Sequence, residues 1–112
     1  MLLDKANLDE LKCNKYLMIV CGPMTDRDKA IVFRGSRIYN NNYEYVGQSH
    51  VELVCCHDVS YGVRQQYNLQ GSTFVLSFRN GLLRDIRSDM VLFKDGNDFH
   101  RAIVDNFDIY VD

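Results

Sequence analysis

The chain has 112 residues, which is the size of one domain, and we expect a single compact domain over residues 1–112. Its composition, 46% hydrophobic and 25% charged, is that of an ordinary globular protein and excludes a generally disordered chain. The formal net charge of −2 argues against a nucleic-acid coat protein, which would be strongly basic.

Apolar runs in the sequence are short. The longest without tyrosine, Leu17–Cys21, has five residues, whereas a transmembrane helix needs about 20. The first 25 residues lack the basic start and the apolar stretch of a secretory signal. We therefore expect a protein without a membrane partner, located in the cytoplasm, where its four cysteines would be reduced thiols.

The composition favours strands joined by polar turns. Asp and Asn, which prefer caps and turns, number 12 and nine, against three Glu and three Ala. Val, Ile, Tyr and Phe, which suit half-buried sheets, together number 30.

The first elements are predicted from a capping pattern and an apolar run. Asn7 followed by Glu10 has the order of a capping box, which predicts a short helix over about 7–13. Residues 15–21 are continuously apolar after Lys15, which favours a buried central strand. Gly22 and Pro23 then end that strand.

The next segment is predicted to be a hairpin. Apolar residues over 29–34 indicate a strand, and Gly35-Ser36 before another apolar segment is typical of a two-residue turn. Three asparagines interrupt the chain at 40–42, and a short strand is expected over 43–46.

The second half contains the strongest turn signal, Asn80-Gly81, which predicts a hairpin between strands over 72–79 and 82–86. Apolar spacing predicts a helix over 98–106. Further short strands are expected over 50–57, 59–63, 90–93 and 107–111. The predicted fold class is α+β: a mainly antiparallel sheet of about seven to nine short strands, with two short helices, one near each terminus.

Cys55-Cys56-His57-Asp58 is the first candidate for chemistry, because a thiol, an imidazole and a carboxylate can form a nucleophilic site. Neighbouring residues on a strand point to opposite faces, so Cys55 and Cys56 would not share one site. The preferred interpretation is that the cysteines fill small core spaces.

A metal site is not predicted. Zinc ligands usually come as close pairs, whereas Cys13 and Cys21 are eight residues apart and Cys55 and Cys56 are adjacent. We expect no cofactor and assign no catalytic residue. No phosphate-binding, dinucleotide-binding or serine-hydrolase motif is present.

Arginine and tyrosine gather around the predicted turns, and these residues can anchor protein partners or hold phosphates and bases. They can equally be half-buried sheet residues with solvated hydroxyls. The candidate partner-binding residues are Arg34, Arg37, Tyr39, Tyr43, Tyr45, Arg79, Arg84 and Arg87.

The leading hypothesis is a non-enzymatic protein-binding module, in the manner of a phage or mobile-element accessory protein that inhibits a host enzyme or defence complex. The alternative is a small-ligand or nucleotide-binding protein that uses the Arg/Tyr turns and assembles as an oligomer. The third hypothesis is an enzyme that uses Cys55 or Cys56 with a histidine. A protein partner is expected in the first case, a nucleotide or nucleic acid in the second, and a homodimer would cover exposed edge strands.

Overall fold

A computed structural model describes residues 1–46, 51–88 and 93–107, with only the backbone described over 38–46. The chain divides into two compact units. We call Met1–Pro23 with Val51–Met90 the sheet unit, and Met24–His50 with Val91–Asp112 the helix unit. Each is described by itself, and the expectation of one domain over residues 1–112 stays a prediction.

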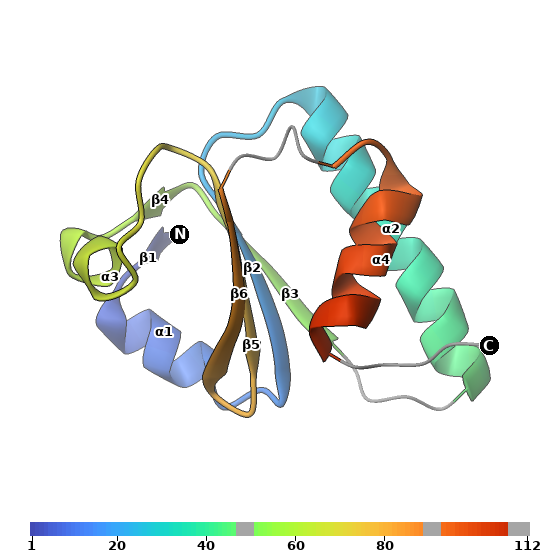
Figure 1. Cartoon of the computed structure of the whole chain (residues 1–112), viewed down its shortest axis with the longest axis horizontal. Coiled ribbons are helices and arrows are strands. Elements are labelled where there is room, and N and C mark those ends of the chain that lie inside the picture. The colour runs from blue at the N-terminus through green and yellow to red at the C-terminus, as the bar shows by residue number, and fades with distance from the viewer. Residues whose placement is uncertain (47–50, 89–92, 108–112) are drawn as a thin grey trace. The chain divides into compact units, whose positions relative to one another are not determined.

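The sheet unit is built on four strands in the order β3-β2-β5-β6 (Figure 1). The central strand β2 (Tyr16–Cys21) is parallel to β3 (Val51–Cys56) and antiparallel to β5 (Phe74–Arg79). β6 (Leu82–Ser88) is antiparallel to β5. A second, two-stranded parallel sheet joins β1 (Leu2–Leu3) to β4 (Asp58–Val59).

Two short helices lie on the same side of this sheet (Figure 1). α1 (Lys5–Leu11) begins after Asp4, whose carboxylate accepts from the Asn7 N–H at 2.8 Å. α3 (Tyr61–Gln66) begins after Ser60, whose hydroxyl accepts from the Val63 N–H at 3.3 Å. Such caps satisfy backbone donors that the first turn of a helix leaves unpaired.

The core of the sheet unit lies between these helices and one face of the sheet. The buried side chains that form it come from alternate positions of β2 and β5 and from both helices; they include Leu8, Leu17, Ile19, Val63, Phe74, Leu76 and Phe78. Alternate residues of a strand share a face, so the same face also carries Cys21.

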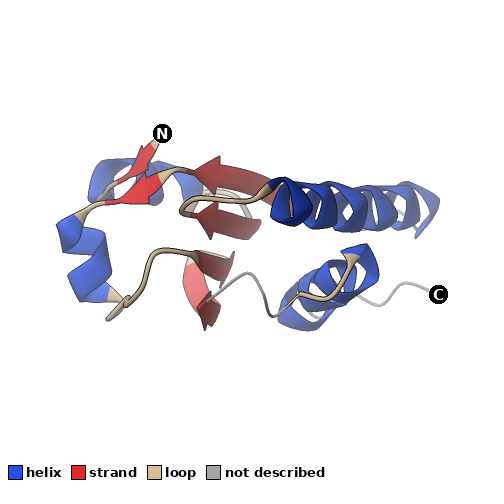
Figure 2. Ribbon diagram, turned by 90° about the horizontal axis from the view of Figure 1, so that it is seen from above, coloured by secondary structure: helices blue, strands red, loops and turns tan. Residues whose placement is uncertain are grey.

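The helix unit pairs α2 (Asp26–Val46) with α4 (Gly96–Phe107), which lie side by side (Figures 1 and 2). Two glycines permit the close approach. A Cβ on Gly35 would lie 2.6 Å from Cδ1 of Phe99, and a Cβ on Gly96 would lie 2.6 Å from Cβ of Arg34. Phe93 packs edge-on against Phe99 with centroids 5.1 Å apart.

The predicted fold class is wrong in its main feature. The described residues form four helices, a four-stranded mixed sheet and a two-stranded parallel pair, instead of a mainly antiparallel sheet of seven to nine strands with two helices. The protein nevertheless remains α+β.

The largest error is the hairpin predicted over 29–46, which is the helix α2. Thr25 and Asp28 cap this helix reciprocally: the Asp28 N–H donates to Thr25 Oγ1 at 3.1 Å, and the Thr25 N–H donates to Asp28 Oδ2 at 3.2 Å. Gly35 therefore marks a helix contact and no turn is formed there. The strand predicted over 59–63 is wrong for a similar reason, because Ser60 caps α3.

Other elements are confirmed. The Asn80-Gly81 turn joins β5 to β6, with positive φ at both residues (53° and 78°), as a hairpin turn of this type requires. The predicted helices near the two ends correspond to α1 and α4, although Asp4 caps α1 and the cap predicted at Asn7 is wrong. Phe107 ends α4, and the rest of the strand predicted over 107–111 lies outside the described residues, as do 90–92 of the strand predicted over 90–93.

Candidate thiol site

Two cysteines face each other on the central parallel strand pair of the sheet unit. The register of β2 and β3 places Cys21 opposite Cys56, at the carboxyl end of both strands. Residues in register on parallel strands point to the same face, and both side chains belong to the same buried cluster. Both are free thiols, exposed by 0% and 3% of their surface.

The turn after Cys21 fixes the end of β2. Gly22 has φ +105°, and a Cβ there would lie 2.0 Å from the Ser72 carbonyl oxygen, so only glycine fits. The Gly22 N–H donates to the Cys56 carbonyl at 2.8 Å. The ends of β2 and β3 and the loop before β5 are thus held together at one residue.

Arg64 of α3 supports the same end of the sheet. Its Nε donates to the Val59 carbonyl at 3.3 Å and its Nη1 to the Gly71 carbonyl at 3.0 Å. Its guanidinium carbon lies 5.2 Å from the centroid of Phe74, which is in register with Cys21 on β5. A positive charge is therefore held near the thiols.

The two thiols differ in acidity. Their mutual hydrogen bond and burial raise the pKa of Cys21, whereas that same hydrogen bond and the N-terminal ammonium lower the pKa of Cys56 against the effect of its own burial. Cys56 therefore ionises first, with the Cys21 thiol donating to it. A thiolate is the nucleophile in thiol–disulfide exchange, so Cys56 is the reactive member of the pair.

Cys55 provides a contrast with its neighbour. Cys55 is an exposed residue. Partial desolvation of its thiol, together with the adjacent Cys56, raises the pKa of Cys55. The expectation that Cys55 and Cys56 point to opposite faces is confirmed by the register of β3. His57 Nδ1 lies 2.7 Å from the N-terminal nitrogen, and Asp58 pairs with Arg64 at 3.6 Å, so these side chains are engaged in local contacts.

The predicted partner-binding residues are divided between the units. Arg34 and Arg37 lie exposed on α2, where Arg37 covers the ring of Phe33 at 5.6 Å. Tyr39, Tyr43 and Tyr45 are also in α2, with side chains outside the described part. These five residues lie on a helix, and the turns around which they were predicted to cluster do not exist.

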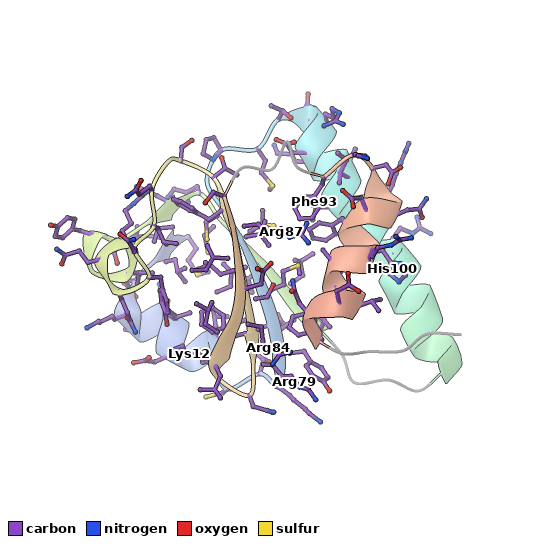
Figure 3. The ribbon with its side chains drawn as sticks, viewed as in Figure 1. Lys12, Arg79, Arg84, Arg87, Phe93 and His100 are labelled. Carbon is purple, nitrogen blue, oxygen red and sulfur yellow. The ribbon has the colours of Figure 1, made fainter. Side chains whose placement is uncertain are left out.

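The remaining three candidates lie on the β5–β6 hairpin (Figure 3). Arg79 ends β5, Arg84 lies at a register shift in β6, and Arg87 pairs with Asp85 at 3.4 Å. Partner binding by these three residues stays a prediction.

A shallow depression of about 220 Å³ lies beside the Gly22 turn, lined by Gln70, Gly71, Ser72, Thr73 and Ser88. Thr73 Oγ1 donates to the Pro23 carbonyl at 3.4 Å along its edge. Over residues 1–46, 51–88 and 93–107, no three His, Cys, Asp or Glu side chains gather as metal ligands. In the same ranges, no helix is both long and apolar enough to span a bilayer.

Sequence reasoning missed the pairing of Cys21 with Cys56. One signal was available: Cys21-Gly22-Pro23 directly follows a buried strand, and a Cys-x-x-Cys motif at such a place is typical of thioredoxin-like redox proteins. Here Met24 occupies the position of the second cysteine. Gly22 and Pro23 were interpreted only as the end of a strand.

Comparison with solved structures identifies the fold. The zinc-bound form of human ERp44 is similar over 94% of this chain, with a TM-score of 0.60 and 17% identity, and the chain spans 30% of the ERp44 chain. Reduced Schistosoma mansoni thioredoxin pre-protein is similar over 92% of this chain and 94% of its own, with a TM-score of 0.51 and 12% identity. Neither a family model nor a curated protein matches the sequence.

The chain therefore has a thioredoxin fold. This overturns the leading hypothesis of a phage or mobile-element inhibitor, and the nucleotide-binding alternative gains no support. The closest earlier hypothesis is the cysteine-dependent enzyme, although it paired a cysteine with a histidine and did not consider two cysteines on adjacent strands.

Proposed function

We propose that this protein exchanges disulfides with a protein or peptide substrate through Cys56. The observation that carries the proposal is the buried pair of free thiols at the carboxyl end of β2 and β3, where Cys21 is the register partner of Cys56. The thioredoxin fold supports the same class of chemistry.

The reacting step is a displacement at sulfur. The Cys56 thiolate attacks one sulfur of the substrate disulfide, a mixed disulfide forms, and the other substrate sulfur leaves as a thiolate that takes a proton from water. A thiol reductant later restores Cys56. The hydrogen bond from Cys21 and the N-terminal ammonium favour the thiolate form of Cys56.

Access to Cys56 is the limiting feature, since only 3% of the residue is exposed. Leu3 of β1 belongs to the buried cluster that contains Cys56. β1 is held by two register pairs with β4 and by the Ser60 N–H donating to the Leu3 carbonyl at 2.8 Å. Opening so short a strand pair requires far less free energy than global unfolding, and we propose that substrate reaches Cys56 through local opening at this end of the sheet.

The test is the reduction of insulin by dithiothreitol, with and without the protein. The wild type is expected to accelerate the reaction, and Cys56→Ala to remove the acceleration. Cys55→Ala is the matched control, because it deletes the adjacent thiol on the opposite face and should retain the wild-type rate. An unchanged rate in Cys56→Ala, or no acceleration by the wild type, would overturn the proposal.

Protein substrates are part of this proposal, whereas a homodimer stays a prediction from the sequence. A cytoplasmic location also stays a prediction, and it bears on the direction of exchange. In a reducing compartment the pair would be kept as thiols and would reduce its substrates.

A further inference from the structure

We propose that Cys21 is the resolving thiol: it attacks the mixed disulfide on Cys56 and closes a disulfide across the two parallel strands. This inference rests on the proposed function. In a Cys-x-x-Cys motif, both thiols belong to one turn of the chain. Here Cys21 and Cys56 are 35 positions apart in sequence, and the register of two strands brings them together.

The spacing of the strands permits the bond. Neighbouring strands lie about 4.8 Å apart, and disulfides join Cα atoms that are about 4.4–6.8 Å apart. Cys21 and Cys56 are direct register partners and share one face of the sheet. The resolving thiol therefore needs no rearrangement of the backbone to reach its target.

Cys13 and Cys55 cannot serve this purpose equally well. Cys55 is in register with Val20 and faces the other side of the sheet. Cys13 lies exposed after α1, where its Sγ donates to the Asp9 carbonyl at 3.7 Å. Among the four thiols, only Cys21 is aligned with Cys56.

The pKa of Cys21 depends on the state of Cys56. The largest cause of its raised pKa is the hydrogen bond with Cys56. Once Cys56 is bonded to a substrate sulfur, it is no longer a thiolate, and the hydrogen bond that raises the pKa of Cys21 is lost. Cys21 then becomes easier to ionise at the stage when its thiolate is needed.

The resolving step exchanges the substrate sulfur on Cys56 for the sulfur of Cys21. Cys21 loses its proton to solvent and its thiolate attacks Cys56 Sγ. The mixed disulfide breaks and the remaining substrate sulfur leaves as a thiolate, which is protonated. Over both steps the substrate disulfide gains two electrons and two protons, and the Cys21–Cys56 dithiol loses the same.

The experiment uses oxidised glutathione as the substrate disulfide. Wild type, Cys21→Ala and Cys55→Ala are incubated with it, quenched in acid, and examined by intact mass and peptide mapping. Wild type and Cys55→Ala should yield a Cys21–Cys56 cross-linked peptide with little glutathione on Cys56. Cys21→Ala should retain about tenfold more glutathione on Cys56, because intramolecular attack outpaces a second bimolecular exchange.

The outcomes separate the two proposals. If Cys56 carries the same glutathione adduct in wild type and Cys21→Ala, and no cross-linked peptide forms, the resolving role is overturned while Cys56 exchange stands. If Cys56 carries no adduct in either protein and no cross-link forms, the proposed function itself fails.

Alanine at a fully buried position could disturb folding, so Cys21→Ser is a second variant, and circular dichroism selects the variant that folds. The wild-type cross-link does not depend on any substitution. Its absence under oxidised glutathione at any concentration that modifies Cys56 would by itself overturn the inference.

Discussion

The two ends of β2 are surrounded by different kinds of residue: aromatic rings and cations at the amino end, and cysteines and glycine at the carboxyl end. At the amino end, Lys15 Nζ and Arg79 Cζ lie 5.3 and 5.8 Å from the centroid of the Tyr16 ring. Lys12 Nζ lies 5.5 Å from the fully buried Phe78 ring, which also packs edge-on against Tyr67. Figure 3 shows Lys12 and Arg79 at this end of the sheet.

At the carboxyl end, β2 and β3 carry small side chains, beside the single buried ring of Phe74 on β5. Cys21 and Cys56 face each other, and Gly22 lets the backbone of the next loop approach closely. Large buried rings contribute more burial free energy than thiols, whereas thiols contribute reactivity. We therefore expect the amino end to determine stability and the carboxyl end to determine exchange, except at Gly22, where the backbone itself is constrained.

The largest effect is expected from Gly22→Val. Its side chain would enter the 2.0 Å space before the Ser72 carbonyl, at φ +105°, so strain and overpacking add. We expect a loss of about 4 kcal/mol or more in the free energy of unfolding, measured by urea denaturation. Gly62→Ala is the control, because nothing lies within 4 Å of a Cβ there and the helix should gain up to about 1 kcal/mol. Equal stability of the two variants would contradict this account of the turn.

A smaller effect is expected from Phe78→Leu at the amino end. The variant should lose about 1–2 kcal/mol, because a smaller side chain leaves part of the buried ring volume unfilled. Its insulin reduction, measured on the folded protein, should equal that of the wild type. Leu82→Ala is the control: Leu82 is 72% exposed, and the change should lie within about 0.5 kcal/mol. A Phe78→Leu variant of full stability but reduced exchange would reverse the proposed division between the two ends.

The sequence predicted the parts of the fold that depend on local patterns. Continuous apolar residues identified β2, Asn80-Gly81 identified the β5–β6 turn, and helical spacing identified α4. The segment 26–46 failed because its aromatic and β-branched residues favour strands, whereas the Thr25–Asp28 cap and the contact of Gly35 with Phe99 stabilise a helix. That contact joins residues 64 positions apart, so local propensity could not reveal it.

The candidate site was less predictable than the fold. Each cysteine was visible, and the alternation of Cys55 and Cys56 was predicted correctly. The partnership of Cys21 and Cys56 depends on which strands are neighbours and on their register, and a shift by one residue would have paired Cys21 with Cys55 instead. A single sequence contains no local pattern that specifies the register of two parallel strands joined by a helix.

The smallest effect concerns the acidity of neighbouring thiols. Alkylation of Cys56 and Cys55 by iodoacetamide, followed by peptide mass spectrometry across pH, should give a lower midpoint for Cys56. The reason is its lowered pKa: the thiolate, which is the reactive form, is half populated at a lower pH. The midpoint is the relevant quantity, because the small exposed fraction of Cys56 slows its absolute rate of alkylation.

The variant Cys21→Ala separates the effect of the Cys21 hydrogen bond on the Cys56 pKa from the effect of nearby charges. It removes the hydrogen bond that lowers the Cys56 pKa and leaves Arg64, His57 and the N-terminal amine in place. The Cys56 midpoint should rise toward that of Cys55. If the Cys56 midpoint stays low in Cys21→Ala, the charge of the N-terminus favours the thiolate instead. The pairing of the two sulfurs would then explain the geometry of the site but not its reactivity.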